Sequence, residues 1–142
     1  MQPLLTDLLG LKGIEVETYR DHGGGLLLEV EAKSDSATCP RCGEVSAHLH
    51  QNHGHLVRDL DISERPVWLK VNRRQFKCQT CQKPFSEALD FLGKRMSYTN
   101  RLAQRVVKQV IHSDVSNVAR NHGLSEDVVW SMVEYLSKKT PD

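Results

Sequence analysis

Two pairs of cysteines with the same spacing constrain the fold of this chain more than any other feature of its sequence. Two residues separate Cys39 from Cys42, and two residues also separate Cys78 from Cys81. A two-residue gap in a tight turn lets both thiolates face one metal ion, so the two turns together complete a tetrahedral site. No fifth ligand or open position is implied. We therefore expect one structural Zn²⁺ bound by all four cysteines.

Two disulfides or a redox-active pair are the alternatives to zinc. The N-terminus has no basic segment before its apolar stretch, which contains Asp7, so it does not resemble a secretory signal. We therefore expect a cytoplasmic protein, and in that reducing compartment paired motifs favour a metal. The apolar runs, such as Leu26–Leu28, are too short to span a bilayer, which argues against a membrane partner.

A group of histidines lies between the two cysteine pairs, at His48, His50, His53 and His55. They offer a second metal site or a replacement for a cysteine ligand. The simpler interpretation is a polar loop whose imidazoles face solvent or phosphate. Because thiolate is the softer donor that zinc prefers, we favour the loop. Whether these histidines bind metal or DNA stays open at this point.

Hydrophobic periodicity divides the chain into three parts and predicts an α+β fold. Residues 1–36 combine closely spaced leucines, ended by Gly10 and Gly13, with two alternating runs around a glycine-rich break, which predicts a helix and an acidic β-hairpin. Residues 37–92 contain the cysteines and a strand-like run over 65–77, as expected for a zinc-ribbon-like β domain. Residues 96–139 have helical periodicity and predict a three-helix domain.

The last part fits a helix-turn-helix. Ala119 is small enough for two helices to touch, and Gly123 follows four residues later, where a left-handed turn is favoured. Ser125 is placed to cap the second helix, with Glu126 and Asp127 in its first turn. A preceding helix over about residues 99–112 would complete the unit. An ordinary helical hairpin shares these features, but their combined spacing favours a helix-turn-helix.

Charge is distributed unevenly along the chain, although its formal net charge is only +1. Residues 1–32 hold two bases and six acids, whereas residues 33–95 hold eleven bases and seven acids. A basic middle segment favours a polyanionic partner, although a basic strand is also an ordinary solvated surface. We predict contacts with double-stranded DNA from the strand and from the helices, namely Lys70, Arg73, Arg74, Lys77, Arg120, Asn121, Ser125, Trp130, Ser131 and Lys138.

The order of these features resembles the N-terminal region of ISL-three family insertion-sequence transposases. The resemblance rests on the knuckle Cys39–Gly43, the run Val57–Leu60, the run Arg73–Cys78, Pro84-Phe85 after the second knuckle and the helix-turn-helix. It extends from about residue 4 to residue 136. In that family the zinc ribbon and helix-turn-helix bind terminal inverted repeats, and a separate downstream domain performs DNA cleavage and joining.

The resemblance implies a zinc-dependent DNA-binding region that is not an enzyme by itself. The sequence ends at Asp142, before such a downstream domain would begin, so we assign no catalytic residue and expect a truncated or split transposase. A homodimer or a catalytic transposase chain is the expected protein partner, and the prokaryotic nucleoid is the expected location. The alternatives are a standalone zinc-ribbon regulator or transposition inhibitor, and a protein-interaction module.

Overall fold

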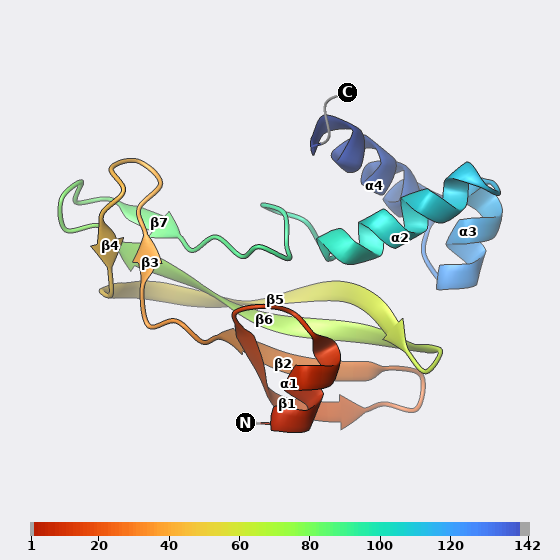
Figure 1. Cartoon of the computed structure of the whole chain (residues 1–142), viewed down its shortest axis with the longest axis horizontal. Helices are drawn as coiled ribbons and strands as arrows, with labels where there is room; N and C mark the ends of the chain where they lie inside the picture. Colours follow the sequence, from red (N-terminus) through yellow and green to blue (C-terminus); the bar gives the residue numbers. More distant parts are fainter. Residues whose placement is uncertain (1, 140–142) are drawn as a thin grey trace.

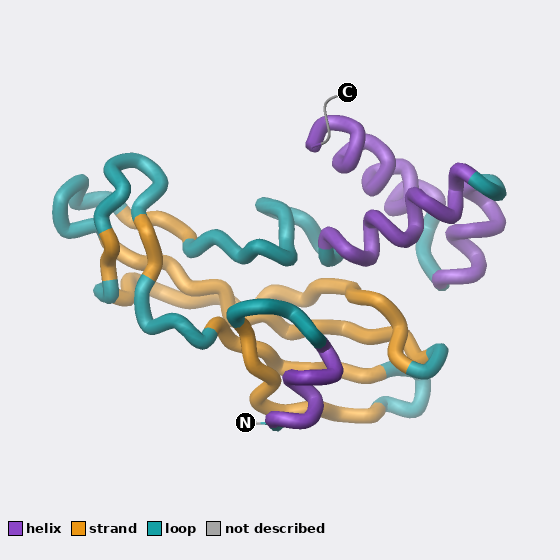
Figure 2. The backbone as a smooth tube through the Cα atoms, viewed as in Figure 1, coloured by secondary structure: helices purple, strands orange, loops and turns teal. Residues whose placement is uncertain are grey.

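A computed structural model describes residues 2–139 of the chain and has an α+β fold, as the sequence predicts (Figures 1 and 2). The helices are α1 (Pro3–Leu9), α2 (Asn100–Ile111), α3 (Val115–His122) and α4 (Glu126–Lys139). The strands are β1 (Ile14–Asp21), β2 (Leu26–Ala32), β3 (Ala37–Thr38), β4 (Val45–Ser46), β5 (Leu49–Ile62), β6 (Arg65–Lys77) and β7 (Pro84–Ser86). Within the described residues, no helix is both long and apolar enough to cross a bilayer.

The main sheet is mixed, with the strand order β1-β2-β6-β5 and with β7 paired to β6. Strands β1 and β2 form the predicted antiparallel hairpin. Strand β2 then pairs in parallel with β6, from Leu26 beside Val67 to Val30 beside Val71. The first two parts of the chain therefore share one sheet. The division of the chain at residues 36, 92 and 96 stays a prediction.

One face of this sheet carries a hydrophobic core. Alternating residues of β2 and β6 are buried on it, because successive side chains of a strand point to opposite faces. Helix α1 covers this core with Leu9, while Leu4 and Leu8 remain exposed. Gly10 ends the helix in the left-handed conformation, with φ of +69°. Residues of the segment after β7 complete the core, which contains Leu28, Val30, Leu69, Val71, Phe91 and Leu92.

Strand β5 corrects the expectation of a polar loop around the histidines. His50, His53 and His55 lie in this 14-residue strand, which forms a long antiparallel hairpin with β6. The strand was missed because its first half is polar and includes Gly54, so it lacks the alternation that marks a half-buried strand. Pairing with β6 satisfies its backbone instead.

Helices α2, α3 and α4 pack around a second core, at the opposite end of the sheet from β3, β4 and β7 (Figure 1). Thr99 caps α2 by accepting a hydrogen bond from the Leu102 amide, and Asp114 caps α3 through the Asn117 amide at 2.7 Å. The buried side chains of this core include Leu102, Ala103, Val106, Val118, Ala119, Val129 and Met132.

Candidate zinc centre and nucleic-acid interface

The two cysteine pairs occupy turns with the same backbone geometry. The first turn connects β3 to β4 and the second connects β6 to β7. Gly43 and Gln82 take the equivalent position after each pair, with φ of +79° and +58°. In the first turn, the Gly43 amide donates to the Cys39 carbonyl at 2.9 Å, and the Cys39 amide donates to the Glu44 carbonyl at 2.8 Å. In the second turn, the Gln82 amide donates to the Cys78 carbonyl at 2.8 Å, and the Cys78 amide donates to the Lys83 carbonyl at 3.0 Å.

These turns bring the four sulfurs together. All four Sγ atoms lie within 4.8 Å of one another, and those of Cys42 and Cys78 are 3.5 Å apart. A tetrahedron with Zn–S bonds of roughly 2.3 Å has sulfurs about 3.8 Å apart, so the spacing suits one zinc ion. Cys39 and Cys78 are buried beside Phe76 and Phe85, whose ring centroids are 6.2 Å apart. The donor set is closed and apolar at its base, as in a structural site.

The electrostatics of the cluster also favour a cation. Burial raises the pKa of Cys39, but backbone amides of Cys42 and Arg41 donate to its sulfur and lower that pKa to about 7. The Glu44 amide lowers the pKa of Cys42, but the neighbouring sulfurs of Cys78 and Cys81 raise it to about 12. Several thiolates this close repel one another, and a divalent cation removes that repulsion.

The histidines do not join a metal site. Among the described residues, the cysteine cluster is the sole group of three or more potential metal ligands that converge. His48, His50 and His53 are exposed. The Nε2 atom of His55 lies 3.0 Å from the backbone carbonyl oxygen of Met96, which connects β5 to the segment before α2. The structure therefore favours a structural use for His55 and leaves the other three at the surface.

The helix-turn-helix geometry follows the predicted spacing. Ala119 and Val118 are buried between the helices, and Gly123 ends α3 with φ of +65°. The Leu124 amide donates to the Ala119 carbonyl at 2.8 Å, which fixes the turn. Ser125 accepts a hydrogen bond from the Val128 amide at 3.2 Å. Ser125 is therefore occupied as the cap of α4.

An ion pair with a buried carboxylate attaches these helices to the sheet. Asp59 on β5 is fully buried and accepts hydrogen bonds from Thr99 Oγ1 at 2.7 Å and from Arg101 Nε at 2.9 Å. A second guanidinium nitrogen of Arg101 lies 2.5 Å from the other carboxylate oxygen of Asp59. Arg101 also donates to the carbonyl of Leu9 at 2.7 Å, so one side chain connects α1, β5 and α2.

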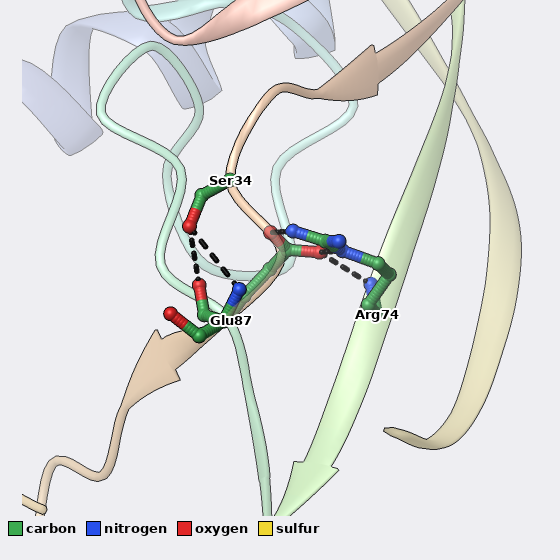
Figure 3. A network of polar contacts seen from close by, with 4 residues as sticks. Ser34, Arg74 and Glu87 are labelled. Atoms are coloured by element: carbon green, nitrogen blue, oxygen red, sulfur yellow. Dashed lines mark hydrogen bonds and ion pairs between the residues drawn. The ribbon is translucent and has the colours of Figure 1, made fainter. Parts of the chain in front are cut away.

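The predicted basic strand does not present one basic face. Lys70 lines a hollow with Glu17, Glu29 and Glu31, on the face opposite the core. Arg74 is held by Glu87, whose carboxylate accepts from Arg74 Nε at 2.8 Å, Nη2 at 3.1 Å and the backbone amide at 2.8 Å (Figure 3). These hydrogen bonds raise the pKa of Arg74. Lys70 and Arg74 are therefore poorly placed to bind phosphate.

Arg73 and Lys77 lie on the opposite face of β6 from Lys70 and Arg74, because successive side chains of a strand point to opposite faces. Both side chains are partly exposed. The Nε atom of Arg73 is buried without a hydrogen-bond partner among the described residues. Arg73 thus combines a buried, unused donor with a place beside a surface cavity.

The predicted contacts on the helices are mostly exposed but differ in their partners. Asn121 is exposed, and Trp130 is 56% exposed. Arg120 donates to the Asn117 side chain at 2.6 Å. Ser131 Oγ lies 2.9 Å from the Tyr98 hydroxyl, and Lys138 pairs with Glu134 at 3.0 Å.

Several basic residues beside surface cavities were not among the predicted DNA contacts. Arg105 and Lys108 on α2 line an open cavity of about 700 Å³ with Asn121. Their spacing on one helix face was available as a signal. Lys94 and Arg95 lie in an irregular segment beside Arg73, and no sequence pattern connects them to β6.

Known transposases have sequences similar to this chain. The family described as zinc-finger of transposase IS204/IS1001/IS1096/IS1165 matches residues 35–81. The family described as helix-turn-helix domain of transposase family ISL3 matches residues 87–137. Over 153 aligned positions, the chain is 31% identical to the transposase for insertion sequence element IS1001 of Bordetella parapertussis. That alignment covers 94% of this chain and 38% of the relative, so the chain spans well under half of the relative's length. No solved structure matches the chain.

Proposed function

Because this chain belongs to the ISL3 family of transposases, in the region that contains its zinc ribbon and helix-turn-helix, we propose that it binds the terminal inverted repeats of an insertion sequence. The partner is double-stranded DNA, and the zinc ion is structural. We place this binding in the prokaryotic cytoplasm, at the nucleoid. We assign no catalytic role to the residues of this chain.

The observation that carries the proposal is the attachment of the helix-turn-helix to the sheet that also carries the cysteine turns. The Asp59–Arg101 pair, the Thr99 hydroxyl and the Arg58 guanidinium all connect the two parts. A recognition helix needs a fixed orientation to place its side chains against base edges in the major groove. Strand β5 of the sheet supplies that support from one side.

Exposed side chains of α3 and α4 are the proposed contacts with bases. Trp130 offers an apolar surface for thymine methyl groups, and Asn121 offers the paired donor and acceptor that match adenine. Arg120 is suited to phosphate. Glu126 and Asp127 at the start of α4 repel phosphate, so we expect α4 to use its middle rather than its first turn.

Binding to the DNA that flanks the gene tests the proposal. We expect protection of a short segment at each end in a footprint, and at least about a thousandfold preference over a scrambled duplex. The absence of a salt-sensitive, sequence-preferring complex would contradict the proposal and leave a protein-interaction module. An intact reading frame for a catalytic domain beside the gene would favour a transposase function, and its absence a regulator or inhibitor that occupies the same ends.

A homodimer or a separate catalytic chain is part of the same proposal. Two inverted repeats are related by symmetry, and a two-fold protein assembly would match them. Sedimentation of the chain with and without a duplex that carries both repeats would show whether two copies assemble on DNA.

A further inference from the structure

A basic groove lies between the zinc ribbon and the segment that precedes α2. Two neighbouring cavities, of about 670 and 220 Å³, share Arg73, Gln75, Ser86 and Arg95 in their walls. Arg41 from the first cysteine turn and Lys94 line the larger cavity. The groove therefore collects cations from the zinc turn, from β6 and from the segment after β7.

The groove has a strong positive balance. Its walls contain four cations and one carboxylate, that of Glu87. Arg74 outside the groove neutralises that carboxylate with two guanidinium contacts (Figure 3). Within residues 2–139, the side chains of Arg73, Lys94 and Arg95 form no hydrogen bond or ion pair, and Arg73 Nε is buried with its donor unused. Unpaired guanidinium donors in a groove are typical of a site for anions.

The turn that carries Lys94 and Arg95 is held in place. The Met96 amide donates to the Gly93 carbonyl at 3.2 Å, which closes the turn. A Cβ atom at Gly93 would lie 2.4 Å from the hydroxyl oxygen of Tyr135, so the turn packs directly against α4. Arg95 has a backbone φ of +64°, a conformation that residues other than glycine rarely adopt.

We propose that this groove, lined by Arg41, Arg73, Lys94 and Arg95, binds the phosphodiester backbone of duplex DNA beside the segment that α4 contacts. The inference rests on the proposed function, because it supplies a second contact with the same DNA. The groove continues from the turn against α4 to the first cysteine turn, so it extends the DNA contact from the helices to the zinc ribbon. Phosphate contacts of this kind set affinity and register without selecting bases.

The salt dependence of DNA binding tests the groove. The probe is a labelled duplex of about three helical turns that carries the DNA flanking the gene, with a scrambled duplex beside it. Each phosphate contact adds about 0.9 to the slope of log affinity against log salt concentration. We expect Arg73→Gln with Arg95→Gln to lower that slope by about 2 on both duplexes. Sequence preference should persist, because the helices supply it.

A control variant removes one charge from the other face of the sheet, and it is matched to the single-charge groove variant Arg95→Gly. Arg20 pairs with Leu27, which pairs with Trp68, so Arg20 lies on the same outer face as Lys70. Arg20→Gln alone should leave the slope within about 0.5 of the original. Arg95→Gly provides a second groove variant, since glycine suits φ of +64° and the fold should persist. It should lower the slope by about 1.

The outcomes separate the two proposals. In one outcome the original protein binds DNA, and both groove variants are folded, contain zinc and keep the original salt slope. That outcome would overturn the groove proposal alone. Equal losses in Arg95→Gly and in Arg20→Gln would also overturn it, because they would reflect overall charge. An original protein that binds neither duplex would overturn the proposed function and the groove together.

Discussion

The guanidinium of Arg58 donates a hydrogen bond to the backbone carbonyl of His122 at 2.8 Å. Arg58 lies on β5 and His122 is the last residue of α3, so this bond connects the sheet to the turn of the helix-turn-helix. Arg58 also pairs with Asp61 at 3.2 Å, and its guanidinium lies 5.5 Å from the Trp68 ring centroid. The carbonyl of His122 is at a helix end, where it lacks a partner within the helix.

Replacing Arg58 should therefore loosen the helices from the sheet. We expect Arg58→Leu to lower the free energy of unfolding by about 1–3 kcal/mol, since a partly buried carbonyl loses a charged donor. Urea denaturation measures the loss, and hydrogen exchange should increase first around residues 119–124. The matched control is Arg65→Leu, which breaks an exposed pair with Asp21 and should cost less than about 1 kcal/mol. Equal effects of the two variants would contradict this role of Arg58.

Replacing the buried carboxylate of Asp59 should lower the free energy of unfolding more than replacing an exposed acid. Asp59→Asn leaves Arg101 and the Thr99 hydroxyl with a weaker partner. Because Arg101 is about one-third exposed, solvent replaces part of the loss, and we expect about 2–3 kcal/mol of destabilisation. Asp35→Asn, at an exposed acid outside the strands, serves as the control in the same urea titration. A change below about 0.5 kcal/mol for Asp59→Asn would show that the pair does not attach the helices.

Loss of one zinc ligand should unfold the ribbon. We expect Cys39→Ser and Cys78→Ser each to release zinc and to destroy the structure of residues 37–92, because structural zinc supplies about 10–16 kcal/mol of apparent folding free energy. Metal analysis by mass spectrometry checks the zinc stoichiometry. A substitution that leaves all four cysteines in place, such as His48→Gln, is the control. A stoichiometry near one zinc ion per chain in both serine variants would refute the four-cysteine site.

Zinc affinity should weaken as pH falls. The pKa of Cys42 is raised to about 12, so below that pH zinc must displace its proton. The pKa of Cys39 is lowered to about 7, so its thiol adds a second proton to displace only below about pH 7. We expect the apparent Kd to rise at least about tenfold for each pH unit between 8 and 6. Competition with a chromophoric chelator measures this, and a pH-independent Kd would contradict thiolate ligation.

The exposed indole of Trp130 and the hydroxyl of Ser125 should behave differently. Trp130→Ala should weaken binding to the flanking duplex by about tenfold or more, with a stability change below about 0.5 kcal/mol, because the side chain is largely exposed. Ser125→Ala should instead cost about 1 kcal/mol of stability, since it removes the cap of α4. Calorimetry and anisotropy on both variants separate the roles. A stability loss for Trp130→Ala without a loss of DNA affinity would place the indole in the fold instead.

The features that are local in sequence were predictable. The two cysteine turns, the β1-β2 hairpin and the helices around Ala119 and Gly123 each depend on residues within a few positions of one another. Turn geometry, alternation and helical spacing act over that range, so they leave a signal in the sequence. The zinc ligands were predictable for the same reason, because the local geometry of each turn places its own two sulfurs.

The basic surface could not be predicted in the same way. Arg73 and Arg74 are neighbours in sequence, yet Arg74 binds Glu87 and Arg73 faces the groove. Their assignment depends on which face of β6 each residue occupies and on where the segment after β7 crosses it. Lys94 and Arg95 join Arg73 because Phe91 and Leu92 pack into the core and bring that segment onto the sheet.

The sequence by itself determined the α+β class, the zinc-binding turns and the helix-turn-helix, because each is encoded by short-range spacing. Tertiary structure alone decided the parallel pairing of β2 with β6, the polar strand β5 and the distribution of cations between two faces of the sheet. These depend on backbone hydrogen bonds and ion pairs between residues far apart in the chain, such as Arg74 with Glu87 and Asp59 with Arg101. Such contacts form only when the whole core is assembled, and local patterns do not specify them.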